Sequence, residues 1–483
     1  MNIKLALKHI QNTSIVAFVL LSFLSPNYTI AQKNERPNIV LILTDQHKAD
    51  AIGFVGKHPV KTPNLDKLAK SGIRFDNAYV TFPLCTPSRS SMFTGKMPHN
   101  LGVNSNKEGD NHLNPGEKEH VIGNVLSHVG YDCAYGGKWH AHEHSMVTGN
   151  GFEFIAPMGD IGLAEKSIEY INAKKKTENP FFLVVSFDNP HNICEWARDE
   201  PLPYGNIPAV ELAKTPQLPV NFKKSKDFPE VLTWEQEANK KVYPTAHYSE
   251  ADWRQYLYAY YQLVEKVDVE IGKIIDAIDA AGIRQNTLIL FTSDHGDGNA
   301  AHGWNQKTAL FQETTKVPFI VSYPGTIKKS KKANSALISN GIDLYPTICD
   351  YADVLVNETL PGESLKSLFE GKLKETKRDF VVVETKFEGK QALGTIGRAV
   401  ISKKYKYVLY NWGKNKEQLF DLEKDPFEMD NLAKDKRHQK TLDIYRSHLY
   451  EWCKKTKDSK FLRKVVLPSN TAISSQDLFT TPW

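Results

Sequence analysis

The sequence is poor in cysteine, has no long apolar run and carries little net charge. Five cysteines occur in 483 residues, and their irregular spacing excludes both a small disulfide scaffold and a Cys-x-x-Cys metal site. The formal net charge of only +5 predicts no nucleic-acid partner. Internal repeats and low-complexity tracts are also absent. Because 41% hydrophobic and 24% charged residues are ordinary for a globular protein, fibrous and disordered classes are excluded.

The amino-terminal residues predict a secretory signal peptide. Lys4 and Lys8 precede an apolar run at residues 15–24, which is too short to span a bilayer comfortably. We predict that residues 1–31 are removed, that the protein is exported to the periplasm or secreted, and that no stable membrane span remains. An uncleaved membrane anchor is the alternative, but no charged residue directly closes the run as a stop-transfer sequence would.

Buried strands alternate with helical patterns through most of the chain. Continuous runs of β-branched residues and leucine are typical of strands covered on both faces of a parallel sheet. Such runs occupy residues 38–44, 181–187 and 287–292, with a weaker one at 131–135. Helical patterns lie between them at residues 64–71, 119–129 and 252–281. This order predicts an α/β fold with a central, mostly parallel sheet.

Polar side chains follow these strands where each strand ends. Ligands collect outside the carboxyl ends of parallel strands, because the connecting loops converge there. A single aspartate at such a place is more often a helix cap or a turn residue, but here two donor pairs accompany several basic side chains. Carboxylates in such pairs suit a hard divalent cation. The pairs are Asp45 with Gln46 and Asp294 with His295, and the basic side chains are Lys138, His140 and His191.

The pattern changes in the last quarter of the chain. We predict a catalytic domain over residues 32–375 and a small C-terminal α+β subdomain over residues 376–483. Residues 204–245 are rich in proline and lysine without strong periodicity, which predicts an insertion over the face of the sheet. The subdomain is expected to contain short antiparallel strands at residues 380–384, 398–402 and 405–410 and a helix at residues 439–453.

One pentapeptide is far more specific than these patterns. Residues 85–89 read Cys-Thr-Pro-Ser-Arg, which resembles the C-x-P-S-R signature of type I sulfatases. A purely structural role for Cys85, as a buried or disulfide-bonded cysteine, is an alternative. Other blocks of the chain, however, resemble the same family. These blocks are residues 36–46, 62–66, 72–75, 136–140, 189–191, 293–296 and 418–428, with Lys307 where the family carries a second lysine. The resemblance covers nearly all of the mature chain and is to bacterial polysaccharide sulfatases in particular.

This resemblance implies a fold, a modification and a metal ion. The fold is an alkaline-phosphatase-like α/β sandwich. A sulfatase-maturation enzyme would oxidise Cys85 to formylglycine (3-oxoalanine), whose hydrated aldehyde attacks sulfur. One Ca²⁺ would be bound by Asp45, Gln46, Asp294 and His295, with the modified Cys85 completing the site. Because many relatives carry a second aspartate in place of Gln46 and asparagine in place of His295, Mn²⁺ stays an alternative.

The resemblance also assigns roles to the basic residues. Arg89 and Lys138 would stabilise the hydrate and its oxyanion, while Lys138 and Lys307 would neutralise charge on the sulfate oxygens. If residues 88–90 begin a helix, Cys85 lies just before its positive end, a place suited to an anion. A histidine suits both the base and the acid of the reaction near neutral pH. The candidates are His140 as base and His191 or His302 as acid.

The expected substrate is a sulfated polysaccharide or its oligosaccharides, and an algal polymer such as ulvan is favoured. His302, Glu195 and Arg198 are candidate substrate contacts, although the segment with Glu195 and Arg198 also suits an ordinary helix surface. Two alternatives stay open. The replacements in the metal site resemble those of phosphodiesterases and phosphonate monoester hydrolases of the same superfamily, and an unmodified homologue would be a sugar-binding protein.

Overall fold

Strand β1 (Asn38–Asp45) lies at the centre of the fold. The computed structural model describes residues 36–107, 109–143, 149–356, 359–469 and 471. Every residue of β1 after the first is buried, and Leu41 pairs with Val184 on one side and Leu290 on the other. Both neighbouring strands run parallel to β1, as expected for an apolar run covered on both faces. The predicted signal peptide lies outside the described residues.

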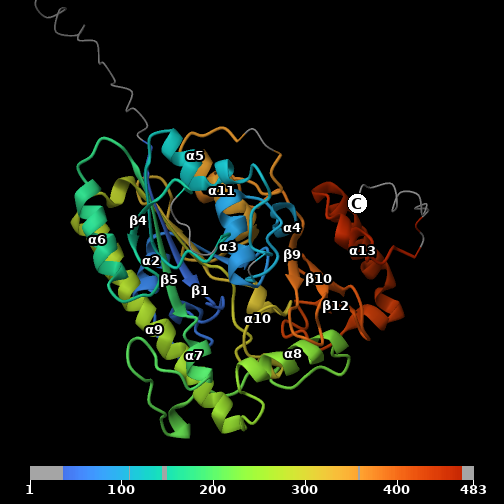
Figure 1. The fold of residues 1–483 in the computed structure, drawn as a ribbon. Coiled ribbons are helices and arrows are strands. Elements are labelled where there is room, and N and C mark those ends of the chain that lie inside the picture. Colours follow the sequence, from blue (N-terminus) through green and yellow to red (C-terminus); the bar gives the residue numbers. More distant parts are fainter. Residues whose placement is uncertain (1–35, 108, 144–148, 357–358, 470, 472–483) are drawn as a thin grey trace, which may run out of the picture. The chain divides into compact units, whose positions relative to one another are not determined.

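Eight strands form the main sheet, in the order β4-β3-β5-β1-β6-β7-β2-β8 (Figure 1). Besides β1 they are β2 (Ile73–Tyr79), β3 (Asp132–Gly137), β4 (Glu153–Ala156), β5 (Phe181–Pro190), β6 (Thr287–Ser293), β7 (Phe319–Ser322) and β8 (Asn334–Ser339). β7 pairs antiparallel with both of its neighbours, whereas the other pairs are parallel. The carboxyl ends of all the other strands therefore lie at one edge of the sheet.

Helices cover both faces of this sheet (Figure 1). Leu41 and Leu43 of β1 enter one hydrophobic core and Ile42 enters a second one, because successive side chains of a strand point to opposite faces. The first core packs against α3 (Cys85–Thr94), α5 (Ile122–His128) and α11 (Asn340–Tyr351), and the second against α2 (Pro63–Ser71), α6 (Leu163–Lys174) and α9 (Glu250–Ala280).

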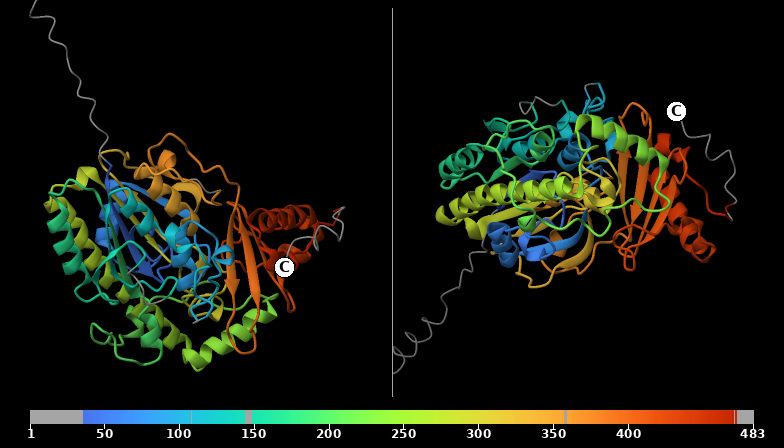
Figure 2. Two further views of the ribbon diagram at one scale, coloured as in Figure 1. Left: turned by 45° about the horizontal axis from the view of Figure 1, so that its top comes forward. Right: turned by 90° about the horizontal axis from the view of Figure 1, so that it is seen from below.

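A four-stranded antiparallel sheet, in the order β12-β11-β10-β9, forms the C-terminal part. Val381 and Val383 on one face join the first core of the main sheet, and Val382 on the other face packs against α13. In Figure 2 the red helices lie on the side of the orange strands that faces away from the main sheet. The elements are β9 (Val381–Lys386), β10 (Ile396–Ile401), β11 (Tyr405–Tyr410), β12 (Glu417–Asp421) and α13 (Gln439–Thr456). The predicted α/β fold with a C-terminal α+β part is confirmed, and the domain boundaries at residues 31 and 375 stay predictions.

Shorter helices connect these elements. One of them, α8, forms within the segment 204–245, where the sequence lacks the periodicity that would have predicted it. Among the described residues, no helix combines the length and the hydropathy of a membrane span. The remaining helices are α4 (Pro98–Leu101), α7 (Ile193–Ala197), α8 (Glu230–Val242), α10 (Gln312–Thr315), α12 (Lys366–Phe369) and α14 (Ser459–Leu462), and the 3₁₀ helices are Gly53–Val55, Lys118–His120, Leu212–Lys214, Arg284–Asn286, Ala301–Gly303, Leu432–Lys434 and Lys436–His438.

His99 joins α4 to β9 of the C-terminal sheet and to the end of α13. Its Nδ1 contacts Glu384 of β9, and its Nε2 lies 3.0 Å from the carbonyl oxygen of Thr456. Nearby, Arg398 of β10 pairs with Asp458 at 2.8 Å. Burial lowers the pKa of His99, but the attraction of Glu384 outweighs burial, so the pKa lies above its ordinary value of 6.5.

We expect His99→Gln to destabilise the protein more at acidic than at alkaline pH. Protonated His99 contributes its full stabilisation below about pH 6.5, the pKa of histidine in an unfolded chain, and this contribution disappears as the pH rises through the higher pKa of the folded state. The variant should lose about 1–3 kcal/mol of unfolding free energy below that pH and less at alkaline pH. Denaturant unfolding at the two pH values measures this difference, and equal losses would contradict the assignment.

Candidate functional site

The carboxyl ends of four neighbouring strands bring the predicted polar residues together. β1 ends on Asp45, and Asp294 directly follows β6. Lys138 follows β3, and His191 follows β5. These strands are consecutive in the sheet order β3-β5-β1-β6. Residues that are far apart in the sequence therefore lie at one edge of the sheet, as the sequence pattern predicts.

Helix α3 presents Cys85 at its positive end. Cys85 is the first residue of the helix, and all ten residues of the helix are buried. Pro87 lies in the first turn, where the N–H that proline lacks has no partner within the helix. The expected helix start at Ser88 is wrong, since the helix begins at Cys85. The thiol therefore lies on the helix N-terminus itself, where the helix dipole favours negative charge.

Three polar groups contact the Cys85 thiol. Lys307 Nζ donates to Sγ at 3.1 Å, His295 Nε2 lies 3.3 Å from Sγ, and Asp45 Oδ1 lies 3.8 Å from it. Burial and Asp45 raise the pKa of the thiol, but the surrounding cations, Lys307 first among them, outweigh both and hold it well below its ordinary value. Electrostatics at this position therefore stabilise a negative charge.

Arg89 is fully buried between two carboxylates. Its Nε donates to Asp294 Oδ2 at 2.7 Å and its Nη2 to Asp45 Oδ2 at 3.2 Å. Its Nη1 donates to Ser186 Oγ at 2.7 Å and to the carbonyl oxygen of Lys138 at 2.8 Å. The guanidinium charge is thus compensated on two sides. Arg89 fixes the two carboxylates relative to α3.

Lys138 is a second buried cation in contact with two carboxylates. Its Nζ lies 2.9 Å from Asp45 Oδ2 and 2.7 Å from Asp188 Oδ1. Burial lowers the pKa of Lys138, but Asp188 and Asp45 outweigh burial and hold it well above its ordinary value. Sequence reasoning did not single out Asp188. Its place near the carboxyl end of a buried apolar run, like that of Asp45, is the signal that would have found it.

Asp297 orients the side-chain amide of Gln46. Asp297 Oδ2 accepts a hydrogen bond from Gln46 Nε2 at 2.7 Å, and its Oδ1 accepts from the backbone N–H of Asn299 at 2.7 Å. Because the amide nitrogen is held on this side, the amide oxygen faces away from Asp297. The backbone N–H of Gln46 donates to Asp294 Oδ1 at 3.1 Å. Sequence reasoning missed Asp297, although it lies only three residues after Asp294.

Asp45, Cys85, Asp294 and His295 form what we call the cysteine cluster. Their ligand atoms all lie within 4.8 Å of one another, and all four residues are buried. His295 Nδ1 lies 2.8 Å from the carbonyl oxygen of Gly296, which places the proton on Nδ1 and leaves Nε2 as a ligand atom. Two carboxylates, an imidazole nitrogen and a sulfur atom thus converge in a way that suits a metal ion.

The loop that carries Lys307 has a strained backbone. Gln306 and Thr308 have φ angles of 76° and 74°. Gln46 and His140 also have positive φ angles, of 69° and 38°. Residues other than glycine adopt this region rarely, and such strain collects at functional sites. The backbone therefore holds several of the predicted site residues in conformations that the surrounding fold must enforce.

Comparison with known proteins identifies the family. Residues 37–354 match the family described as Sulfatase, and residues 300–455 match the C-terminal family of N-sulphoglucosamine sulphohydrolase. The chain belongs to the sulfatase family. This sulfatase is 31% identical over 448 residues to the Delta 4,5-hexuronate-2-O-sulfatase of Bacteroides thetaiotaomicron, with 89% of this chain and 91% of that protein covered. It is 30% identical over 455 residues to an ulvan-active sulfatase of Formosa agariphila, with 86% and 81% covered.

The fold of the sulfatase also resembles that of a solved structure. It matches a 2-O GAG sulfatase with a TM-score of 0.79 and 28% sequence identity, covering 92% of this chain and all of the other. The predicted alkaline-phosphatase-like fold is confirmed. The enzyme class, a sulfuric ester hydrolase, is confirmed by the same family membership.

Two predicted histidines of the sulfatase lie close to the cysteine cluster. His140 Nδ1 lies 3.4 Å from the hydroxyl oxygen of Thr86, the residue after Cys85. His191 lies at the end of β5. Burial, Lys138 and Lys307 hold the pKa of His191 well below its ordinary value. These surroundings therefore favour the neutral imidazole of His191 over its protonated form.

The three predicted substrate contacts have surroundings that differ from those of these two histidines. The buried ring of His302 stacks on Phe311 with 4.0 Å between ring centroids, and its Nε2 lies 3.3 Å from Asn221 Nδ2. These partners, and not the groups of the cysteine cluster, enclose it. Glu195 and Arg198 lie in and directly after α7, and they pair with each other at 2.9 Å with 25% and 27% of their side chains exposed. Their roles toward a substrate stay predictions.

Proposed function

We propose that the protein is an exported sulfatase that removes sulfate esters from a sulfated polysaccharide or its oligosaccharides, such as those of ulvan. The observation that carries the proposal is the Cys85 thiol at the start of α3, 3.1 Å from Lys307 Nζ and inside the cysteine cluster. Its Cys-Thr-Pro-Ser-Arg sequence suits oxidation to formylglycine by a maturation enzyme. Relatives named for a hexuronate and for ulvan support a carbohydrate substrate.

The cysteine cluster fits one divalent cation, for which we propose Ca²⁺. Burial, and after it the neighbouring Asp45, raises the pKa of Asp294 to about 6, and a cation bound beside Asp294 would favour its ionised form. Asp45, Asp294 and His295 would hold the ion together with the amide oxygen of Gln46. These residues would hold the ion where its positive charge would bind and polarise the oxygens of a sulfate ester.

The remaining site residues supply the nucleophile and stabilise negative charge on the substrate. Formylglycine at position 85 supplies a hydrated aldehyde as the nucleophile for sulfur. Lys307 and Lys138 lie around the same position and remain charged, so they hold the sulfate oxygens and neutralise charge that builds up on them. Arg89 keeps the carboxylates and α3 in place while the dipole of that helix adds to the positive potential.

Two histidines are assigned to the two proton transfers of the reaction, one as base and one as acid. We assign His140, beside Thr86, to the removal of a proton from the nucleophile, and His191 to the protonation of the departing alkoxide. The low pKa of His191 rises when a negatively charged sulfate ester lies beside it, because a nearby negative charge favours the imidazolium. His302 is the weaker candidate for the acid, since Phe311 encloses its ring. Glu195 and Arg198 remain proposed sugar contacts.

Paired assays with an aryl sulfate and the matching aryl phosphate test the reaction. The matured protein should favour sulfate by at least about 100-fold in kcat/KM, a difference of about 2.7 kcal/mol in transition-state free energy. A preference for phosphorus esters would instead identify a phosphodiesterase or a phosphonate monoester hydrolase. Release of sulfate from ulvan oligosaccharides tests the substrate class, and binding without release would identify a sugar-binding homologue.

Asp297→Asn should weaken Ca²⁺ binding by about 10–100-fold. An asparagine at this position donates a hydrogen bond as well as accepting one, so the amide oxygen of Gln46 is no longer forced away from it. Calorimetric titration with Ca²⁺ measures the affinity directly. Tyr256→Phe is the control, because it removes only a hydroxyl that donates to Asp297 at 3.3 Å. Equal Ca²⁺ affinities of Asp297→Asn and the unaltered protein would contradict the role of Asp297.

A further inference from the structure

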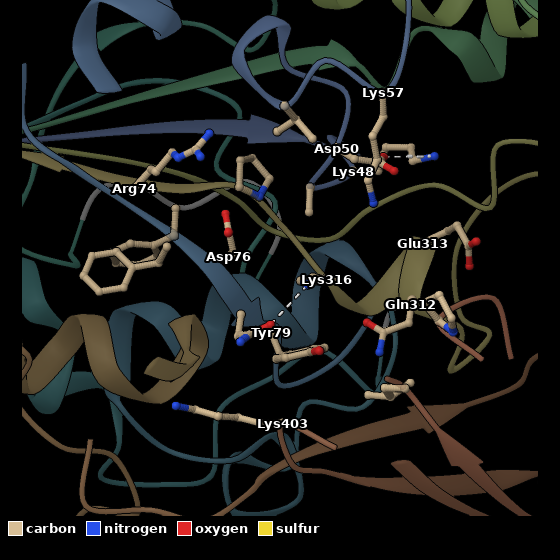
Figure 3. A pocket seen from close by; sticks show the side chains of 18 of the residues that line it. Lys48, Asp50, Lys57, Arg74, Asp76, Tyr79, Gln312, Glu313, Lys316 and Lys403 are labelled. Carbon is tan, nitrogen blue, oxygen red and sulfur yellow. Dashed lines mark hydrogen bonds and ion pairs between the residues drawn. The ribbon is translucent and has the colours of Figure 1, made fainter. Parts of the chain in front are cut away.

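A separate cavity opens beside β2 (Figure 3). Its walls come from the segment after β1, from β2, from α10 and the residues after it, and from the loop at residues 422–427. Its volume is about 470 Å³, within the range of about 300–1,000 Å³ typical of small-molecule sites. No residue that lines it belongs to the cysteine cluster. We call it the β2 cavity.

Three basic side chains of the β2 cavity have no acidic partner within ion-pair distance among the described residues. They are Lys57, Arg74 and Lys316. Lys316 Nζ donates to the amide oxygen of Asn77 at 3.2 Å, and the guanidinium of Arg74 lies 4.7 Å from the ring centroid of Phe54. Neither of these partners carries a negative charge. The cavity therefore offers positive charge that the protein itself does not neutralise at close range.

Lys316 is the clearest of these three cations. Burial and the neighbouring Lys57 lower its pKa, whereas Asp76 and Asp50 raise it from a longer distance without restoring it. The half-buried ammonium contacts two uncharged groups, the amide of Asn77 and the ring of Tyr79, whose centroid lies 5.9 Å away, so part of its hydration is lost without a full compensating charge. An anionic group of a ligand in the cavity would supply that charge.

The wall of the same cavity also carries hydrogen-bond acceptors, the exposed carboxylate of Asp76 among them. Within the described part of the chain, Glu313 Oε2 and Gln312 Oε1 are buried without a hydrogen-bond partner, although Glu313 Oε1 accepts from Asn221 at 2.9 Å. Asp76 adds a carboxylate to the wall, and Phe427, which is 45% exposed, adds an aromatic surface. Hydroxyl groups satisfy such acceptors, and the apolar faces of sugar rings pack on aromatic side chains.

We propose that the β2 cavity binds one residue of an acidic sugar, apart from the catalytic thiol. A neutral sugar would leave Lys316 without a counter-charge, and inorganic sulfate would meet Asp76 and Glu313 without donating a hydrogen bond to either. A sugar with a carboxylate or a sulfate group supplies both parts, the anion for Lys316 and the hydroxyls for the exposed carboxylate of Asp76. The inference rests on the cavity alone and does not require the proposed reaction.

Titrations with D-glucuronate, D-glucose and sodium sulfate, followed by ligand-observed NMR, test this proposal. Glucuronate carries no sulfate ester, so the enzyme does not consume it. It should bind at least about tenfold more tightly than the other two, and Lys316→Met should raise its Kd about tenfold. The control is Lys403→Met, which should change that Kd less than about twofold, since Lys403 lines the cavity but already pairs with Glu375 at 2.7 Å.

Two further measurements test whether the β2 cavity and the catalytic site bind their ligands independently. His191→Ala should leave the Kd for glucuronate unchanged, and Lys316→Met should leave the turnover of a small aryl sulfate unchanged. If Lys316→Met does not fold, Arg74→Gln replaces it, with the same expected loss of affinity. The proposal is overturned by absent glucuronate binding, by equally tight glucose binding, by loss of glucuronate binding in His191→Ala, or by unchanged affinity in the folded cavity variant.

Discussion

Cys85→Ala is expected to lower kcat for an aryl sulfate by roughly 10⁴-fold to 10⁶-fold while leaving the fold intact. The substitution removes the sulfur atom that the proposed maturation enzyme would oxidise, so no formylglycine can form at position 85. Cys194 cannot replace it, because burial raises the pKa of that thiol to about 12 and keeps it protonated. Steady-state kinetics measure the loss, and circular dichroism checks the fold.

Cys133→Ala is the matched control for this variant. Cys133 is a buried cysteine of β3 in the first hydrophobic core, and burial raises its pKa to about 12. Its replacement should reduce stability slightly and leave kcat within about twofold, since it belongs to the packing and not to the cysteine cluster. Substantial activity in Cys85→Ala, or a large loss of kcat in Cys133→Ala, would refute the role of the nucleophile.

Arg89→Met should destabilise the protein by about 3–5 kcal/mol, because breaking a buried ion pair leaves uncompensated charge in the interior. The variant leaves Asp45 and Asp294 buried without the guanidinium that lies 3.2 Å and 2.7 Å from them. Guanidinium chloride unfolding, with the midpoint converted to a free energy, measures the effect. Activity should fall as well, because the same carboxylates define the cysteine cluster.

Arg446→Met shows whether burial causes this loss. Arg446 makes a bidentate pair with Glu417 at 2.8 Å and 2.7 Å, but both side chains are partly exposed. Ion pairs that reach solvent contribute about 1 kcal/mol or less, so this variant should be much milder. If the two arginine variants lose equal stability, then buried charge compensation at Arg89 is not the dominant effect.

The central strands could be predicted from the sequence because they are buried on both faces. The runs that became β1, β5 and β6 are continuous and apolar, and their short length and many β-branched or aromatic residues favour a buried strand over a buried helix. β2 was missed because its central residues are mixed, with Arg74 and Asn77 half-buried and Asp76 exposed. The reversed direction of β7 depends on its pairing partners, which no local pattern encodes.

The outline of the site could also be predicted, while its supporting contacts could not. Asp45 is the last residue of β1, and Lys138 and Asp294 directly follow their strands. The sheet therefore places all three at one edge, independently of the loop conformations. The position of Asp188 depends on the irregular end of β5, where the register with β1 shifts, and that of Asp297 depends on the backbone path after β6. The contact between His302 and Phe311 could not be predicted from the sequence. It depends on the conformation of the loop before Lys307, which has positive φ angles.

Mass spectrometry of the peptide that contains Cys85, taken from active enzyme, tests the central claim most directly. The account predicts a loss of about 18 Da relative to the unmodified cysteine, as the thiol is converted to the aldehyde. The other cysteine peptides of the same digest serve as internal references and should keep their unmodified masses. An intact thiol at Cys85 in protein that hydrolyses sulfate esters would contradict the account.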